Sequence, residues 1–312
     1  MSESAVVLTL AAAVAAGTPL ALAALGELLT ERAGVLNLGV EGMMLMGAVV
    51  AFLAGDATGS PWLGLAAGMV TGGALAAVHA FLAVTMRANQ IVAGLALVIF
   101  GTGLSTFLGQ PVEGQPLAAR VGPTAVPGLA EVPVLGPILF QQDLVVYATW
   151  VLAGLATFYL TRTRAGLSLR AVGESPATAD AMGVRVAATR YAHTIVGGLL
   201  AGGGGAYLIL ARVPSWSQAA TTNGIGWIAL ALVVFSSWRP LRALAGAYLF
   251  GAALRANFAL QAGGVRGIPA EVLAMLPYVL TIAVMIGLSV SNLRQRIGAP
   301  AALGVPYVRD ER

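Results

Sequence analysis

The stretch LLTERAGVLNLGVEGMMLMGA, residues 28–48, places the carboxylate of Glu41 among Met, Leu, Val and Gly residues. A charged side chain at mid-membrane costs at least about 2.5–3.5 kcal/mol on insertion scales, so such residues usually face a bundle interior or a wet cavity. Of the 312 residues, 58% are hydrophobic and 10% are charged, and the mean hydropathy is +0.86. Soluble domains are far more polar than this. The composition therefore predicts an integral membrane protein.

Long apolar runs predict that the chain crosses the membrane as helices. Several runs reach the roughly 20 residues that a helix needs to cross a hydrocarbon core of about 30 Å, and the short alternating strands of a barrel are not seen in the sequence. We predict one all-α transmembrane domain over residues 1–312, with about nine (8–10) helices. The predicted spans are 5–25, 34–54, 62–86, 90–109, 143–160, 190–211, 224–237, 243–260 and 276–292. The second is rich in Gly and is expected to be broken or re-entrant.

The distribution of arginine predicts the orientation of the chain. If the connection 161–189 is cytoplasmic, thirteen of the 17 basic residues lie on that side, and the other side keeps Arg120, Arg212, Arg255 and Arg266. Cytoplasmic loops of membrane proteins carry such an excess of positive charge. The N-terminus is therefore expected outside and the C-terminus in the cytoplasm.

Missing residue types exclude several kinds of site. All basic residues are Arg, so a phosphate-binding P-loop, which needs Lys, is excluded. Cysteine is absent, which excludes thiolate chemistry and Cys-ligated metals. His79 and His193 have no acidic neighbour at metal-ligand spacing and are expected to be packed residues. We expect no cofactor and no metal on this chain. Because Arg in a membrane protein marks the cytoplasmic face, we expect contact with membrane lipids and no nucleic-acid partner.

Two connections between spans are informative. Residues 110–142 form the longest outer connection and contain six prolines, which prevent a continuous helix. This connection is either a structured external loop or a docking surface for an external partner. In the cytoplasmic connection 161–189, Ser175 is a good N-cap, Pro176 suits the first helical turn and Gly183 is a natural stop, so a short helix is predicted at 176–182. This helix either lies on lipid headgroups or is a coupling helix held by a separate motor protein.

Four segments together resemble one protein family. They are LLTERAGVLNLGVEGMMLMGA (28–48), NQIVAGLALVIFGTGLSTFL (89–108), LRAVGESPATADAMGV (169–184) and GIGWIALALVVFSSWRPLRALAGAYLFG (224–251). They resemble the permease subunits of bacterial ABC importers, in the branch shared by branched-chain amino acid, simple sugar and nucleoside systems. The resemblance covers roughly residues 20–295. It is strongest to nucleoside-type permeases that work with lipoproteins of the basic membrane protein class.

The resemblance implies a fold, an activity and partners. The fold is that of a type II ABC importer permease in a bacterial inner membrane. The chain would be a transport subunit and not an enzyme, importing nucleosides with simple sugars or branched-chain amino acids as alternatives. ATP would be hydrolysed by separate ATPase subunits. The other partners would be a second permease chain, which is either a copy or a paralogue of this one, and an external solute-binding lipoprotein. The residues that would contact the ATPase are Arg170, Gly173, Glu174, Ser175, Pro176, Ala177, Asp180 and Gly183. An ion-coupled secondary transporter is a less favoured class, because only Glu41 is an acid well inside a predicted span.

Polar residues inside or beside the spans are candidates for the solute path: Asn37, Glu41, Asn89, Gln90 and Trp227. On a continuous helix, Asn37 and Glu41 share one face. If that helix starts near Gly34, Glu41 lies about 10 Å from its cytoplasmic end. Glu41 is either a clamp on backbone freed at a broken helix or a residue of the path.

The other candidates each have two interpretations. Asn89 and Gln90 either cap a span or meet the leaving solute. Trp227, like Trp238, is either an interface anchor or, at 227, a surface that stacks on a base.

Overall fold

The computed structural model describes residues 3–213, 215–217, 221–262 and 298–309, with 272, 275, 276, 279–283 and 286 between the last two ranges. These residues form helices and connections, with three isolated bridges and no strand. The α-helices are α1 (Glu3–Arg32), α2 (Val40–Thr58), α3 (Pro61–Ala80), α4 (Gln90–Gly109), α5 (Leu144–Arg162), α6 (Arg164–Glu174), α7 (Pro176–Ala181), α8 (Val186–Tyr207), α9 (Ile225–Phe235) and α10 (Pro240–Ala262). Single π-helical turns continue α3 at Phe81–Thr85 and α8 at Leu208–Arg212.

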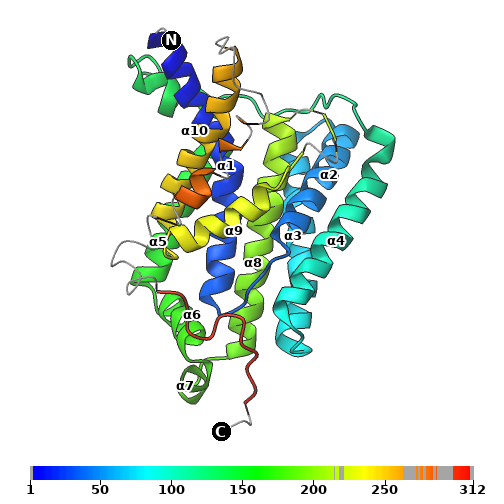
Figure 1. Ribbon diagram of the computed structural model, residues 1–312, viewed down its shortest axis with the longest axis vertical. Coiled ribbons are helices and arrows are strands. Elements are labelled where there is room, and N and C mark those ends of the chain that lie inside the picture. Colours follow the sequence, from blue (N-terminus) through cyan, green and yellow to red (C-terminus); the bar gives the residue numbers. More distant parts are fainter. Residues whose placement is uncertain are drawn as a thin grey trace.

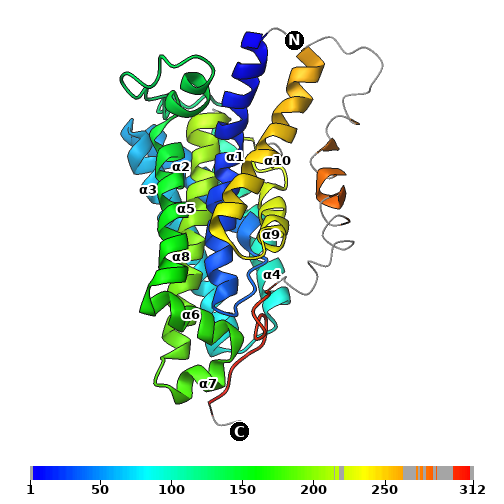
Figure 2. The same ribbon diagram turned by 90° about the vertical axis from the view of Figure 1, so that its left-hand side faces the viewer.

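The long helices form one bundle (Figure 1). α8 packs against α1, α2 and α3, and α4 covers the outer side of α2. On the other side of α1 lie α5 and α10. Figure 2 shows that α1 starts at the end of the bundle opposite to α7 and the segment 298–309. The short helices α6 and α7 therefore lie at the end of the bundle opposite to the start of α1, where α6 packs against α5.

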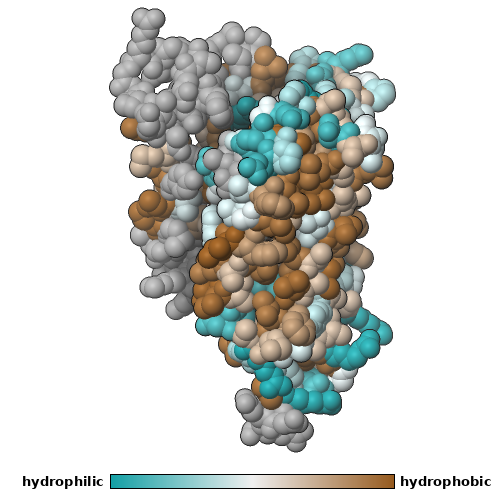
Figure 3. All heavy atoms as spheres, turned by 90° about the vertical axis from the view of Figure 1, so that its right-hand side faces the viewer, coloured by the Kyte–Doolittle hydropathy of each residue, from teal (hydrophilic) through white to brown (hydrophobic). Residues whose placement is uncertain are grey.

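Six of the described helical stretches are long and apolar enough to cross a membrane: Val6–Arg32, Val40–Thr58, Pro61–Thr85, Gln90–Val112, Leu144–Arg162 and Val186–Arg212. Figure 3 shows the face that carries α4, which is hydrophobic along its middle and hydrophilic at both ends. α4 exposes Ile99, Phe100 and Phe107. The predicted polytopic helical membrane protein is confirmed, whereas the count of nine crossings and the orientation stay predictions. The predicted span 276–292 falls mostly outside the described residues.

Three predicted spans differ from the structure. α1 continues to Arg32, so 26–33, expected as a connection, is mostly helical. Gly34 has a φ of +82°, a left-handed conformation that suits glycine and ends α1. The chain does not become helical again until α2 begins at Val40. The expected span 224–237 is α9, with 11 residues. At 1.5 Å per residue it is about 16 Å long, which is too short to cross alone.

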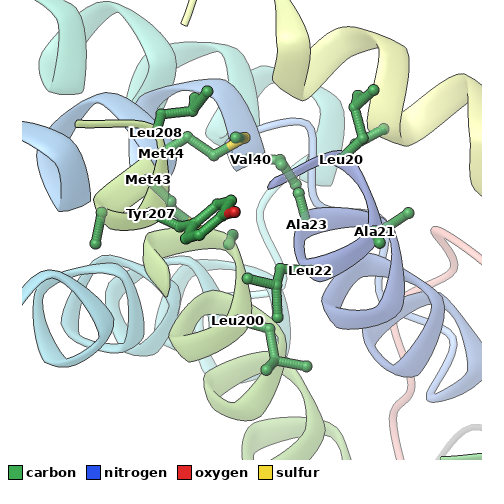
Figure 4. Close-up of a cluster of buried hydrophobic side chains, with 14 of the residues drawn as sticks. Leu20, Ala21, Leu22, Ala23, Val40, Met43, Met44, Leu200, Tyr207 and Leu208 are labelled. Carbon is green, nitrogen blue, oxygen red and sulfur yellow. The ribbon is translucent and has the colours of Figure 1, made fainter. Parts of the chain in front are cut away.

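Small residues and a buried apolar cluster hold the central helices together. A Cβ at Gly68 of α3 would lie 2.6 Å from the carbonyl oxygen of Gly47 of α2, and one at Gly47 would lie 2.5 Å from that of Gly202 of α8. Glycine thus permits backbone contact among three helices. Figure 4 shows Met43 and Met44 of α2 close to Tyr207 in the buried cluster.

The Pro-rich connection 110–142 is folded onto the bundle at the end where α1 starts (Figure 2). Glu113 pairs with Trp216 and Pro123 with Asp143 in isolated bridges. Leu117 is almost completely buried. The connection therefore has its own packed structure, with a π-helical turn at Gly136–Phe140.

Candidate functional site

The carboxylate of Glu41 binds the start of α9. Its Oε1 accepts a hydrogen bond from Thr222 Oγ1 at 2.5 Å and from the backbone N–H of Gly224 at 3.2 Å. Its Oε2 accepts from the N–H of Gly226 at 2.7 Å. The first N–H groups of a helix have no partner within the helix, and the helix dipole is positive there. Glu41 therefore supplies both the missing acceptors and a favourable charge.

The position of Glu41 makes this contact specific. Glu41 is in the first turn of α2, so a single side chain connects the starts of two helices. A Cβ at Gly226 would lie 2.6 Å from Glu41 Oε2, so only glycine leaves room for the carboxylate. Glu41 is buried, and all three of its partners come from residues 222–226. This is the geometry of a clamp between two discontinuous helices.

The non-helical segment 33–39 is held by side chains from three helices. The N–H of Leu36 donates to Gln90 Oε1 at 2.7 Å, and the carbonyl oxygen of Leu36 lies 3.0 Å from His79 Nε2. The N–H of Asn37 donates to Glu27 Oε1 at 3.1 Å. Irregular backbone at membrane depth is tolerated only where the protein or a water-filled cavity satisfies it. Glu27, His79 and Gln90 do this here.

The predicted polar face of Asn37 and Glu41 is wrong, because Asn37 precedes α2. Asn37 is 1% exposed, its Oδ1 accepts from the N–H of Gly39 at 3.0 Å, and its Nδ2 lies 3.5 Å from Met43 Sδ. This local turn keeps 37–39 out of the helix, as Asn side chains commonly do. The helical rise that gave the depth of Glu41 therefore does not apply to 34–39.

The remaining path candidates lie apart from Glu41 or on its partner helix. Asn89 caps α4, its Oδ1 accepting from the N–H groups of Ile91 and Val92 at 3.0 and 3.1 Å. Trp227 is on α9 and is 40% exposed. Trp238 is not an interface anchor: it is 4% exposed and donates its indole N–H to Glu31 Oε2 at 2.5 Å. The reason is that residues 237–239 turn inward against the end of α1.

Sequence reasoning missed the two buried acids of α1, Glu27 and Glu31. They are four residues apart on one helix face, in the sequence GELLTER. The predicted first span ended at 25, so both were counted as part of a connection. No group of three or more acidic or histidine side chains that would hold a metal occurs among the described residues. Both acids serve backbone and indole donors instead.

At the other functional region, α6 and α7 form a short helical pair. Ser175 caps α7, since its Oγ accepts from the N–H of Thr178 at 3.4 Å. Pro176 is the first residue of α7, and Gly183 follows its end with a φ of +83°. Ala177 is exposed, and Met182 is 80% exposed. A groove of about 400 Å³ runs beside α7, lined by Leu167, Ala171, Ser175, Ala179 and Met182 among others.

The other predicted ATPase-contacting residues face the C-terminal segment. The carbonyl oxygen of Gly173 accepts from the N–H of Ala302 at 2.9 Å, and Glu174 Oε2 lies 3.4 Å from the N–H of Ala301. Asp180 forms an ion pair with Arg309 at 3.1 Å. Arg170 is half-buried on α6. The structure thus brings all eight of these residues to one end of the bundle, on α6, α7 and their flanks.

The chain matches the family described as "Branched-chain amino acid transport system / permease component" over residues 9–286. It belongs to this family. The match covers all the long helices described above, so the predicted permease family is confirmed. A match of this extent identifies a transport subunit, whose ATPase resides on another chain.

Three relatives show the range of the family. The putative glucose ABC transporter permease protein TsgC13 of Haloferax volcanii is 41% identical, over 96% of this chain and 97% of the relative. The guanosine ABC transporter permease protein NupQ of Bacillus subtilis is 36% identical, over 94% of each chain. The nucleoside ABC transporter permease protein NupC of Lactococcus lactis subsp. cremoris is also 36% identical, over 94% of each chain. No solved structure matched the chain.

Proposed function

We propose that this permease subunit imports nucleosides in an ABC importer. The observation that carries the proposal is the family membership, together with two relatives named for guanosine and nucleoside transport that align over 94% of the chain. The relative named for glucose is 41% identical, and simple sugars are therefore the second candidate class of solute. Both are small, neutral and rich in hydroxyl groups.

In this proposal α7 is the coupling helix that seats in a cleft of the ATPase. A six-residue helix has too few hydrogen bonds to be stable by itself, so it depends on its caps and on tertiary contacts. Exposed Ala177 on α7 and exposed Met182 directly after it offer a small apolar surface to a partner. α7 also carries no basic residue and no wide apolar face, as a headgroup-bound helix should. These features favour a protein partner over lipid.

Glu41 acts in this proposal as the clamp that positions α9. A clamp explains why the carboxylate is buried with three hydrogen-bond donors, whereas a path residue needs a free acceptor for the solute. The side-chain oxygens of Asn37 and Gln90 likewise already accept hydrogen bonds, from the N–H groups of Gly39 and Leu36. Trp227 lies on α9, the helix that Glu41 binds, and is partly exposed. Of the predicted path residues, it is the one that remains available to stack on a base or a sugar ring.

Family membership supports a proposal for the whole assembly. The importer would contain ATPase subunits, an external solute-binding lipoprotein and a second permease, either a copy or a paralogue of this chain. We place the chain in the bacterial cell membrane with the type II importer fold, about nine crossings, an external N-terminus and a cytoplasmic C-terminus. With this orientation α6 and α7 face the ATPase, and the connection 110–142 faces the binding protein.

The test is uptake by the reconstituted importer. The chain is produced with its partner ATPase, second permease and binding protein from the same organism. Vesicles that contain the complex are loaded with ATP and given labelled guanosine or glucose. ATP-dependent uptake of guanosine is expected. Uptake of glucose alone would establish the second candidate, and uptake that persists without ATP but collapses with an uncoupler would refute the proposal.

A variant of the chain tests the role of α7. Residues 174–183 are replaced by a Gly/Ser linker of equal length, which keeps the chain's reach but removes the helix. The protein is expected to insert in the membrane but to lose both ATPase co-purification and uptake. Retained co-purification would show that α7 is not the ATPase contact.

A further inference from the structure

The C-terminal segment 298–309 is bound along the end of the bundle that carries α7, shown in red in Figures 1 and 2. We call this segment the C-terminal strap. It forms no helix, yet Ala302 is buried and its neighbours are held by backbone hydrogen bonds. Chain ends are usually poorly ordered unless something ties them down. The question is what the strap connects.

At one side the strap is fixed to α6 and α7. The N–H of Ala302 donates to the carbonyl oxygen of Gly173 at 2.9 Å. The hydroxyl of Tyr307 donates to Asp180 Oδ2 at 3.1 Å, and Arg309 Nε lies 3.1 Å from the same oxygen. Asp180 is on α7 itself. The strap therefore holds both the start of the α6–α7 connection and the coupling helix.

At the other side the strap is fixed to the non-helical segment 33–39. The N–H of Gly304 donates to the carbonyl oxygen of Gly34 at 3.1 Å. Arg190, which is buried, donates from Nε to the carbonyl oxygen of Ala33 at 3.2 Å and from Nη1 to that of Val305 at 3.1 Å. One guanidinium thus joins the strap to the residues that follow α1. Segment 33–39 leads directly into α2 and Glu41.

We propose that the C-terminal strap is a coupling element that ties the position of α7 to segment 33–39, and through it to α2 and the Glu41-bound start of α9. The inference rests on the proposed role of α7. Its basis is a continuous series of contacts: Asp180 to Tyr307 and Arg309, the strap backbone to Gly34, and Arg190 between Ala33 and Val305. A displacement of α7 must either break these contacts or move segment 33–39.

The rival interpretation is that the strap only stabilises the fold. The two interpretations differ in what the loss of the strap does. A purely structural strap affects the amount or thermal stability of the permease, with transport per ATP unchanged. A coupling element affects the number of solute molecules moved per ATP hydrolysed, while the complex still assembles.

The experiment uses the complete importer in vesicles and compares Tyr307→Phe, Asp180→Asn and a chain that ends at residue 297. Tyr191→Phe is the matched control, because its hydroxyl binds Thr85 Oγ1 at the same end of the bundle and forms no hydrogen bond with the described residues 298–309 of the strap. Permease level, ATPase co-purification, ATP hydrolysis and guanosine uptake are measured together. Glucose replaces guanosine if that is the solute.

The truncated chain is expected to keep ATPase co-purification and to lose about fivefold or more in transport per ATP, the lower end of typical coupling between sites. Tyr307→Phe and Asp180→Asn are expected to show a smaller loss in the same ratio, and Tyr191→Phe none. Wild-type transport per ATP in Tyr307→Phe, Asp180→Asn and the truncated chain would overturn the inference. If the truncated chain does not accumulate, the two point variants decide. Since the linker variant of 174–183 tests ATPase binding separately, failure of the strap leaves the proposed function standing.

Discussion

Replacing Glu41 by Gln tests the clamp with the least steric change. The amide oxygen of Gln can keep the hydrogen bonds from Thr222 and Gly224 that Glu41 Oε1 now accepts. The amide nitrogen then faces the N–H of Gly226, and two donors cannot bond, so the 2.7 Å interaction is lost. The α9 start also loses the negative charge that its dipole favours.

The expected destabilisation follows from these two losses. A hydrogen bond to a charged group contributes about 1.5–3 kcal/mol. A charge at a helix terminus contributes about 0.3–2 kcal/mol, depending on burial. The sum of about 2–5 kcal/mol is a large part of the 5–15 kcal/mol by which typical proteins are stable. At about 2 °C per kcal/mol for a chain of this size, the melting temperature falls by roughly 4–10 °C.

The assay measures thermal unfolding of the purified permease in detergent, its level in the membrane and uptake per molecule. Asp56→Asn is the matched control, because Asp56 is an exposed acid on the same helix α2. A clamp gives a lower melting temperature and level for Glu41→Gln, with the solute preference unchanged. A wild-type melting temperature with an altered solute preference would refute the clamp and assign Glu41 to the path.

A double-mutant cycle sharpens the result. Thr222→Val removes the hydroxyl that donates to Glu41 Oε1 and preserves the side-chain shape. Because Gln can keep the bond from Thr222, the cycle pairs Thr222→Val with Glu41→Ala. If the two side chains interact, the effects of these two substitutions on unfolding differ from additive by about 0.5–3 kcal/mol. Strict additivity would contradict the direct bond.

Two further predictions concern other parts of the chain. Trp238→Phe is expected to lower the free energy of unfolding by about 1.5–3 kcal/mol, because Glu31 loses the indole N–H donor in a buried site. Trp227→Phe is the partly exposed control and should change the free energy of unfolding little. Equal effects of the two substitutions in thermal unfolding would count against the contact between Trp238 and Glu31. Met182→Cys introduces the sole thiol of a chain without cysteine and is expected to react with a maleimide only when the ATPase is absent. Gly122→Cys on the connection 110–142 should react equally in both cases, and equal labelling of Met182→Cys would argue against docking at α7.

Local signals in the sequence were sufficient for most helices. The span 90–109 coincides with α4 (Gln90–Gly109), and 143–160 differs from α5 (Leu144–Arg162) by two residues at most. The caps at Asn89 and Ser175 are visible in the sequence because they depend on neighbouring residues alone. The same reasoning predicted the short helix at 176–182, which the structure has as Pro176–Ala181.

The parts that were missed depend on distant residues. The glycines of 34–54 predicted a break, but hydropathy is the same whether an apolar stretch is helical or extended, so it does not place the irregular segment at 33–39. That conformation needs Glu27, His79 and Gln90, which come from three different helices. Likewise, Glu41 and Thr222 are 181 positions apart, and no spacing rule connects them. The length of 224–237 did carry a usable signal, since apolar runs of 10–14 residues favour a buried or re-entrant helix over a crossing.

Close backbone contacts at glycine connect the central helices of the bundle. α2, α3 and α8 touch at backbone level through Gly47, Gly68 and Gly202, and packed interfaces of this kind shift between discrete arrangements and do not deform gradually. The start of α9 is attached to α2 through the carboxylate of Glu41 and through close backbone contact at Gly226, where a Cβ would lie 2.7 Å from Glu41 Cα. In the proposed coupling, a displacement that reaches segment 33–39 changes the position of Glu41, and α9 moves with it because α2 and α9 are joined at this point. The carboxylate of Glu41 is best explained by the hydrogen-bond donors at the start of α9, which a buried carboxylate can bind and an apolar side chain cannot.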